Sequence, residues 1–329
     1  MKKKSVENIA EVFKKSKRIA ITSHLRPDGD SICSSLALAL MAKSLGIEAE
    51  IINKDNTPFP FINMPDVKRI KIGQISPQGF DMVILLECAN VSRSGQKNLD
   101  AYFKINIDHH HSNDYYADIN WVDPHRSAVA ELIFILGETL GIRFTPQMAD
   151  HLYCAIVSDT GSFQFSNTNA KAFEICHKLI LLGASPIKTS EFLFNNNSPE
   201  KIKLLGLVLS TLVINKKGNI ASITMFKKFL ESLNLKEIDT EDITTLARSI
   251  SGIEIVLFFK EMQKDTFRVS LRSKGNACSA CIAERFGGGG HMNAAGFTAK
   301  GKYEILKKEI PAKIEKLLTK PLHLNYSKE

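Results

Sequence analysis

Four short apolar segments in the first half of the chain are each followed by acidic side chains. The carboxylates in these positions belong to Asp28, Asp30, Glu87, Asp108 and Asp159. Carboxylates brought close together repel one another strongly unless protons or cations neutralise them. A fold that gathers these segments in one place therefore has to hold positive charge there, which points to bound metal.

Local patterns predict an α/β fold. Strands are predicted at residues 18–24, 47–52, 80–87 and 104–108. Helices are predicted at residues 31–45, 127–140, 146–157 and 169–182. Alternating strands and helices indicate βαβ units and a parallel sheet, whose strands present their carboxyl ends at one edge. We expect a glycine-containing turn to bring Asp159 to the same edge.

The length of 329 residues predicts two domains. The sequence NNNSP at 195–199, followed by a periodic apolar segment, predicts a loop and a helix that connects them. Beyond residue 212 the segments become shorter and mixed in character. We expect a parallel-sheet domain over residues 1–190, a linker with a connecting helix over 191–212, and a smaller mixed α/β domain over 213–329.

The excess of basic residues is concentrated in the second part of the chain. Residues 1–189 contain 21 Lys and Arg against 20 Asp and Glu, whereas residues 190–329 contain 22 against 15. A surplus of this kind favours an anionic partner. The expected partner-binding domain is therefore the second one.

The spacing of the cysteines and the length of the apolar runs both favour a location in the cytoplasm. Six cysteines are scattered through the chain, which predicts reduced thiols in a cytosol, with Cys278 and Cys281 as packing or loop residues. No apolar run approaches the ~18 residues that span a bilayer. We expect a cytoplasmic protein with no membrane partner.

Histidines accompany the carboxylates at the predicted sheet edge. His24 follows the first strand, and His109, His110 and His111 follow Asp108. Imidazole and carboxylate ligands together suit Mn²⁺, Mg²⁺, Fe²⁺ or Zn²⁺.

Farther along, four consecutive glycines precede His291, and glycine lets backbone N–H groups approach an anion closely.

Taken together, these motifs resemble a known family. The pattern His24-x-x-x-Asp28-x-Asp30, then Asp108-His109-His110, then Asp159-Thr160-Gly161, resembles the DHH phosphoesterase family. The segment from Gly287 to His291, followed by Ala294-Ala295-Gly296, resembles the associated DHHA1 domain. The layout without further modules is most similar to the NrnA type, which degrades very short RNAs and often removes the 3′-phosphate of adenosine 3′,5′-bisphosphate (pAp).

The resemblance implies two Mn²⁺ ions per chain, with Mg²⁺ or another divalent metal as the alternative. It assigns His24 and Asp28 to one ion. The other ion takes Asp30, His109 and Asp159. Glu87 is expected to bridge the ions, where the family has the shorter aspartate.

The resemblance also implies catalytic and substrate-binding residues. Asp108 is expected to orient a neighbouring ligand, and His110 to contact the scissile phosphate or help protonate the leaving oxygen. The expected substrate-binding residues are Arg93, Arg272, Gly288, Gly289, Gly290 and His291.

The expected activity is metal-dependent hydrolysis of phosphodiester bonds in very short RNA or DNA oligonucleotides, and of pAp. Cleavage of cyclic dinucleotides or their linear products is the main alternative. A nucleotide-binding protein with an impaired metal site is another, because Glu87 departs from the family pattern. An exonuclease acting on long single strands is disfavoured, since no residues remain for a further nucleic-acid-binding domain. The glycine motif disfavours a type II pyrophosphatase.

Overall fold

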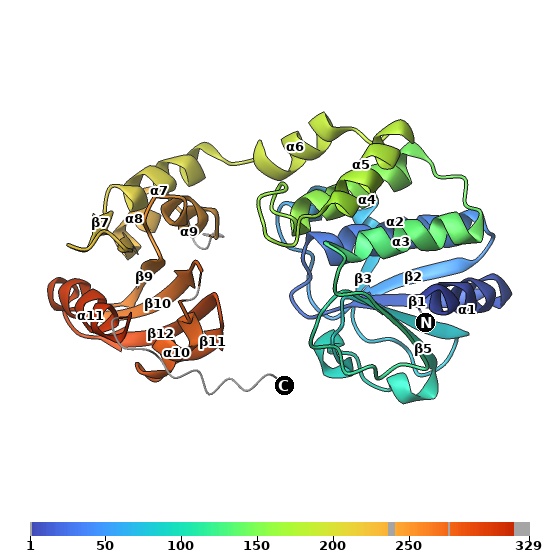
Figure 1. Cartoon of the computed structure of the whole chain (residues 1–329), viewed down its shortest axis with the longest axis horizontal. Coiled ribbons are helices and arrows are strands. Elements are labelled where there is room, and N and C mark those ends of the chain that lie inside the picture. Colours follow the sequence, from blue (N-terminus) through green and yellow to red (C-terminus); the bar gives the residue numbers. More distant parts are fainter. Residues whose placement is uncertain (1, 236–240, 276, 319–329) are drawn as a thin grey trace. The chain divides into compact units, whose positions relative to one another are not determined.

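A computed structural model describes residues 2–235, 241–275 and 277–318 (Figure 1). Contacts divide the chain after Asn196 into two compact units. Among the described residues, no helix is both long and apolar enough to cross a bilayer.

The first unit is built on a sheet of six parallel strands. These are β1 (Arg18–Ser23), β2 (Glu48–Asn53), β3 (Ile70–Ile72), β4 (Met82–Leu86), β5 (Phe103–Asp108) and β6 (Ile119–Val122). They are arranged in the order β3-β2-β1-β4-β5-β6. The order of the strands reverses between β1 and β4, and a reversal of this kind leaves a crevice at the carboxyl ends of those two strands.

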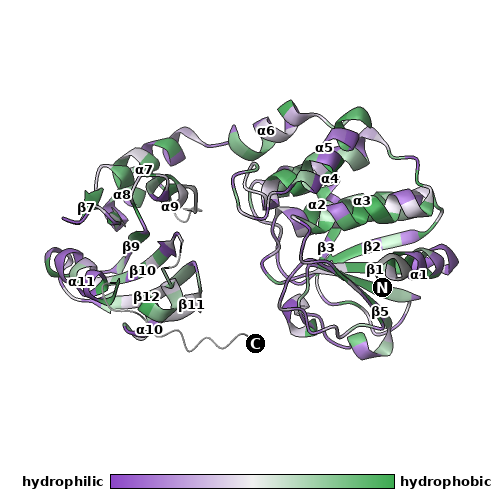
Figure 2. Cartoon of the chain, in the orientation of Figure 1, coloured by the Kyte–Doolittle hydropathy of each residue, from purple (hydrophilic) through white to green (hydrophobic). Residues whose placement is uncertain are grey.

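Helices cover one face of this sheet, and short irregular segments cover the other. The helices of the unit are α1 (Lys2–Lys15), α2 (Gly29–Ser44), α3 (Val129–Leu140), α4 (Pro146–Asp159), α5 (Ala170–Leu181) and α6 (Pro186–Phe194). Along β1, Ile19 and Ile21 pack in the core shared with the helices, whereas Ala20 joins a second core with Val83 and Leu85. Both faces of the central strands are thus buried, and Figure 2 shows these strands and α2 as largely hydrophobic.

The second unit contains a mixed sheet. Its strands are β7 (Val213–Ile214), β8 (Ile220–Met225), β9 (Ile255–Gln263), β10 (Thr266–Ser273), β11 (Gly289–His291) and β12 (Ala294–Lys300). Their order is β11-β12-β10-β9-β8-β7, with β8 and β9 parallel and the other neighbours antiparallel.

Helices lie on both faces of the mixed sheet. They are α7 (Pro199–Leu209), α8 (Lys227–Ser232), α9 (Glu241–Arg248), α10 (Ser279–Glu284) and α11 (Tyr303–Leu318). Leu257 and Phe259 of β9 pack in the core that includes α10 and α11. Val256 and Phe258 pack on the opposite face in the core that includes α7 and α9.

The predicted α/β class is confirmed, and each predicted strand and helix overlaps an observed one. In the first unit, strands β3 and β6 and helix α6 were not predicted. Asp159 is the last residue of α4 rather than part of a turn, so the helix itself carries it to the sheet edge. The helix expected to connect the domains is α7, which begins after Ser198 and packs inside the second unit through Leu204 and Val208.

The expectation of six reduced thiols is wrong for one pair. Cys278 and Cys281 form a disulfide, with their Cα atoms 5.3 Å apart. Cys278 caps α10, and its sulfur accepts a hydrogen bond from the N–H of Cys281 at 3.1 Å. This turn therefore brings the two sulfur atoms together, which the spacing alone did not reveal. The four other cysteines are free and buried.

Candidate metal centre

The loop after β1 presents His24 and Asp28 together. Asp28 caps α2: its Oδ1 accepts the N–H of Ser31 at 3.0 Å, and its own N–H donates to Ser31 Oγ at 3.1 Å. This reciprocal capping fixes the carboxylate at the start of the helix. Its second oxygen, Oδ2, lies 3.5 Å from Nε2 of His24. One carboxylate thus caps a helix and faces an imidazole at the same time.

Gly29 allows two helices to meet where their functional residues lie. A Cβ atom at this position would fall 2.7 Å from Cβ of Ser158 on α4, and closer still to the ring of Phe61. Real Cβ contacts are not that short, so only glycine permits this approach of α2 to the end of α4. The approach brings Asp30 beside Asp159, and ligand atoms of these two residues and His109 lie within 4.8 Å of one another.

Two histidines are oriented so that Nε2 is the nitrogen available to a metal. Nδ1 of His24 lies 2.8 Å from the carbonyl oxygen of Leu25, and Nδ1 of His109 lies 3.0 Å from that of Arg126. A carbonyl oxygen only accepts, so each Nδ1 carries the hydrogen and donates it. Each neutral ring then keeps its lone pair on Nε2, which faces the carboxylates.

Glu87 lies between these two imidazoles at the end of β4. Its Oε1 is 3.3 Å from Nε2 of His109, and its Oε2 is 3.7 Å from Nε2 of His24. The side chain is 2% exposed, and Oε2 has no hydrogen-bond partner within the described residues. The backbone has φ of +56°, which is uncommon for glutamate. A buried carboxylate with an unsatisfied oxygen, flanked by two imidazoles, fits a bound cation.

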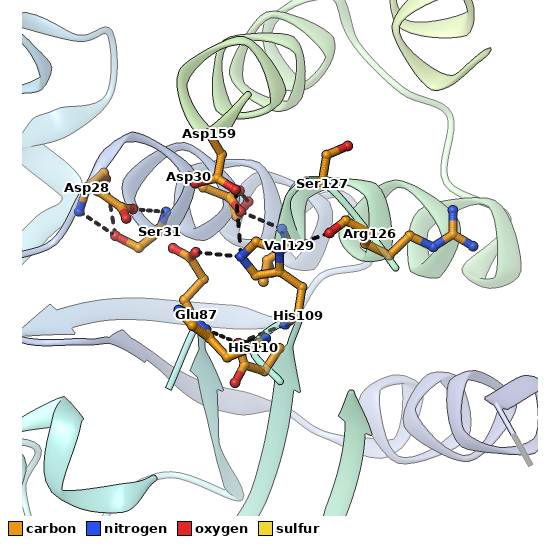
Figure 3. A network of polar contacts seen from close by, with 12 residues as sticks. Asp28, Asp30, Ser31, Glu87, His109, His110, Arg126, Ser127, Val129 and Asp159 are labelled. Carbon is orange, nitrogen blue, oxygen red and sulfur yellow. Dashed lines mark hydrogen bonds and ion pairs between the residues drawn. The ribbon is translucent and has the colours of Figure 1, made fainter. Parts of the chain in front are cut away.

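Among the described residues, the ligand atoms form three overlapping groups, each within 4.8 Å. Figure 3 shows Glu87 and His109 with Asp28, Asp30 and Asp159 around them. The groups are His24, Asp28 and Glu87; Asp30, His109 and Asp159; and Glu87, His109 and His110. Every group mixes imidazole with carboxylate, the donor set suited to a divalent ion such as Mn²⁺ or Zn²⁺. These residues therefore fit the metal that the sequence predicted, and Glu87 belongs to two of the groups.

Without metal, protons supply the positive charge. Burial works against the charged form of His24, but Asp28 and Glu87 raise its pKa to about 10. Burial likewise opposes charge on His109, yet Glu87 and other carboxylates raise its pKa to about 11. Burial, together with repulsion from Glu87, raises the pKa of Asp159 to about 8. The same two causes hold the pKa of Asp30 well above its usual value.

Asp108 belongs to none of the three ligand groups and instead contacts His109 and His110. Its Oδ1 accepts from Nδ1 of His110 at 2.7 Å and from the N–H of His109 at 2.8 Å, and its Oδ2 accepts from Asn113 at 2.6 Å. Burial would raise the pKa of Asp108, but His110 lowers it overall. An ionised Asp108 therefore holds the His110 ring in place and leaves Nε2 free to act.

The expected substrate-binding residues divide between the two units. Arg93 lies in the 3-10 helix η3 (Val91–Ser94), and its carbonyl accepts the N–H of Leu25 at 2.6 Å, so it adjoins the loop after β1. In the second unit, Arg272 of β10 pairs with Ala294 of β12. This position adjoins the hairpin formed by β11, which contains Gly289 and Gly290, and β12. The backbone of His291 also pairs with Ala294, and its side chain lies outside the described part of the chain.

Two of the predicted anion-binding glycines are required for packing. A Cβ at Gly288 would lie 2.6 Å from Cβ of Phe297. At Gly290, with φ of +152°, it would lie 2.5 Å from Cα of Ala295. Gly289 faces open space instead. Gly288 and Gly290 thus let β11 lie against β12, and Gly289 is the position among the three where the backbone is open to a ligand.

Sequence reasoning missed a group of residues around the start of α3. Arg126, Ser127 and Glu131 contact one another, and the N–H groups of Val129 and Ala130 donate to Asp30. A serine just before a helix, with a glutamate in its first turn, was the available signal, because both are typical of a helix start.

Comparison with known proteins gives concordant results. Residues 18–156 match the model of the DHH family N-terminal domain, and residues 226–320 match the DHHA1 domain. The bifunctional oligoribonuclease and PAP phosphatase NrnA of Thermus thermophilus is 31% identical, covering 89% of this chain and 88% of that protein. The protein of the same name from Bacillus subtilis is 30% identical, covering 84% and 88%.

A solved structure also covers nearly the whole chain. The crystal structure of an exopolyphosphatase-related protein from Bacteroides fragilis superposes with a TM-score of 0.85 and 25% identity. The match covers 97% of this chain and 98% of that one.

We expect Gly29→Ala to weaken metal binding. The added methyl group would push α2 away from Ser158 and separate Asp30 from Asp159, at a cost of ~1–3 kcal/mol for overpacking. Thermal unfolding and calorimetric titration with Mn²⁺ measure the two effects. Gly206→Ala in α7 serves as the control, because Gly206 also lies in a helix and its Cβ would meet nothing within 4 Å. A Gly29 variant with wild-type Mn²⁺ affinity would show that the close approach is unimportant.

Metal binding is expected to release protons and to strengthen as pH rises. At pH 7.5 His24 and His109 are protonated in the metal-free protein, because their pKa values are about 10 and about 11. Each must lose its proton to bind metal, and each released proton adds about tenfold in affinity per pH unit. Titration in buffers of different ionisation enthalpy counts the protons. Release of none at pH 7.5 would contradict the charge state described here.

Glu87→Asp and Glu87→Ala should differ sharply. Aspartate keeps the carboxylate and tolerates positive φ better than glutamate, so this variant should retain two metal ions and change turnover. Alanine removes the anion between two cations and should lose one ion. Metal content by mass spectrometry tests both variants. Two full equivalents of Mn²⁺ in the alanine protein would exclude bridging by Glu87.

Proposed function

Because this chain belongs to the DHH family of phosphoesterases and carries the DHHA1 domain, we propose that it is a metal-dependent hydrolase of very short oligonucleotides. It cleaves phosphodiester bonds in oligoribonucleotides, releasing mononucleotides, and removes a phosphate from pAp. The names of the relatives at 30–31% identity support both activities. The observation that carries the proposal is Glu87, whose two oxygens face Nε2 of His24 and Nε2 of His109.

In this proposal the chain holds two divalent ions, Mn²⁺ in the first instance. His24 and Asp28 would bind one, and Asp30, His109 and Asp159 the other. Glu87 would bind both. When bound, two such ions would supply the Lewis acidity that activates water and stabilises negative charge on phosphoryl oxygens.

His110 is the residue we propose for proton transfer. Asp108 accepts the hydrogen of Nδ1 at 2.7 Å, which orients the ring and leaves Nε2 as its second nitrogen. Nε2 is then able to donate to a phosphate oxygen or to deliver its proton to the leaving oxygen. His110 shares a ligand group with Glu87 and His109, so a phosphate held at these residues lies within its reach.

Substrate binding is proposed for residues of both units. Arg93 and Arg272 supply cationic donors, and the open backbone at Gly289 suits a phosphate oxygen. The other residues proposed for substrate binding are Gly288, Gly290 and His291. The two glycines contribute by letting β11 lie close to β12. The surplus of basic residues after residue 190 supports short RNA, short DNA and pAp as partners. The cytoplasmic location stays a prediction: four cysteines are free and buried, whereas Cys278 and Cys281 form a disulfide that this prediction did not include.

The arrangement of ligands supports a working centre over an impaired one. Glu87 is longer than the aspartate of the family pattern, yet its oxygens face both histidines, within 3.3 and 3.7 Å. The left-handed backbone at Glu87 contributes to placing the longer side chain there.

A substrate panel tests the proposed function. With Mn²⁺, RNA oligomers of two to 24 nucleotides, pAp and cyclic dinucleotides are compared by the rate of mononucleotide or phosphate release. We expect dinucleotides to be cleaved fastest and the rate to fall with length, because the residues proposed here for anion binding are few. Equal or faster cleavage of the 24-mer would contradict a short-substrate enzyme, and preference for cyclic dinucleotides would favour the alternative activity.

Two neighbouring histidines provide a matched control for this panel. His110→Ala should lower kcat by ~10²–10⁴, the usual contribution of a general acid or base. His111→Ala removes an exposed imidazole from the adjacent position and should leave kcat near the wild-type value. Similar losses in both variants would argue against a specific role for His110.

A further inference from the structure

One short segment, residues 126–130 before and at the start of α3, contacts metal-ligand candidates from other parts of the chain. The carbonyl of Arg126 accepts from Nδ1 of His109 at 3.0 Å. The N–H groups of Val129 and Ala130 donate to the carboxylate of Asp30, that of Ala130 at 3.1 Å (Figure 3). This backbone thus fixes the tautomer of one ligand and the orientation of another.

The same segment reaches a third ligand through Asn167. Nδ2 of Asn167 donates to the carbonyl of Ser127 at 3.0 Å. It also faces the carbonyl and Oδ2 of Asp159, at 3.1 and 3.4 Å. Asp159 is therefore linked to Ser127 by one side-chain amide. Asp30, His109 and Asp159 are the three members of a single ligand group.

Glu131 holds this segment in shape from the first turn of α3. Its Oε1 accepts from N–H and Oγ of Ser127 at 2.8 and 2.5 Å, and its Oε2 accepts from Nη1 of Arg126 at 3.1 Å. The side chain is fully buried, so these donors replace water around the carboxylate. Arg126 is held in turn by Oδ2 of Asp123 at 3.3 Å.

We propose that Glu131 is a positioning residue for one half of the metal centre. By fixing residues 126–130 it sets the ligand group of Asp30, His109 and Asp159. The other ligands are held by different contacts, His24 by the carbonyl of Leu25 and Asp28 by Ser31. Loss of Glu131 should therefore weaken one metal ion selectively. This inference rests on the proposed function, since it assumes a two-ion centre.

The test compares Glu131→Gln with Glu138→Gln on the same helix. Glu138 forms an exposed ion pair with Lys178 at 3.0 Å, and within the described part of the chain its side chain has no hydrogen bond or ion pair with a candidate ligand. Mn²⁺ binding is measured by calorimetric titration and by electron paramagnetic resonance, which distinguishes a spin-coupled pair of ions from a single ion. We expect Glu131→Gln to keep one tight Mn²⁺, to weaken the other by about 10–100-fold and to lose the coupled signal. Glu138→Gln should match wild type.

A second variant keeps the inference testable if Glu131→Gln does not fold. Asn167→Ala removes the amide between Ser127 and Asp159 from a half-buried position and should cause the same selective loss. If Glu131→Gln lowers the melting temperature but keeps wild-type affinity for both ions, Glu131 has only a structural role and the inference is overturned. Equal weakening of both ions in this variant would also overturn it. Wild-type protein that binds no Mn²⁺ would instead overturn the proposed centre itself.

Discussion

Mutual repulsion among buried carboxylates is the constraint on which this structure depends. Asp30 and Glu87 are each about 1% exposed, and Asp159 lies in the same cluster. Positive charge has to be present there, either as protons on His24 and His109 or as bound cations. Because the Nδ1 atoms of both histidines donate to carbonyl groups, the Nε2 atoms face the carboxylates in either state.

The candidate metal ligands follow or end strands and helices, but contacts with other parts of the chain hold them in place. β1 and β4 supply the crevice, but Gly29 lets α2 and α4 come close enough to join Asp30 and Asp159. The start of α3 then adds backbone donors and an acceptor, shaped by Glu131. A centre of this kind is preorganised because every candidate ligand except Glu87 is fixed by a second contact, which limits the reorganisation needed when a cation binds.

Much of the fold and most of the candidate ligands were predictable from sequence. Strands β1, β4 and β5 are short apolar runs that end at chemically distinctive residues, and a parallel sheet places those ends together. β3 and β6 were missed because they are edge strands of three and four residues with partly exposed side chains, so neither shows a clear apolar pattern. The disulfide between Cys278 and Cys281 was missed because it depends on the turn at the start of α10.

The sequence by itself therefore determined which groups supply the charge and in which order the chain delivers them, because strand ends and capping residues are local properties. Only the tertiary structure decided how these groups meet. Asp159 reaches Asp30 through a helix contact that leaves no room for a Cβ at Gly29, and Glu131 acts on His109 through the backbone of Arg126. Contacts of this kind join residues far apart in the chain, and their geometry follows from packing rather than from any local pattern.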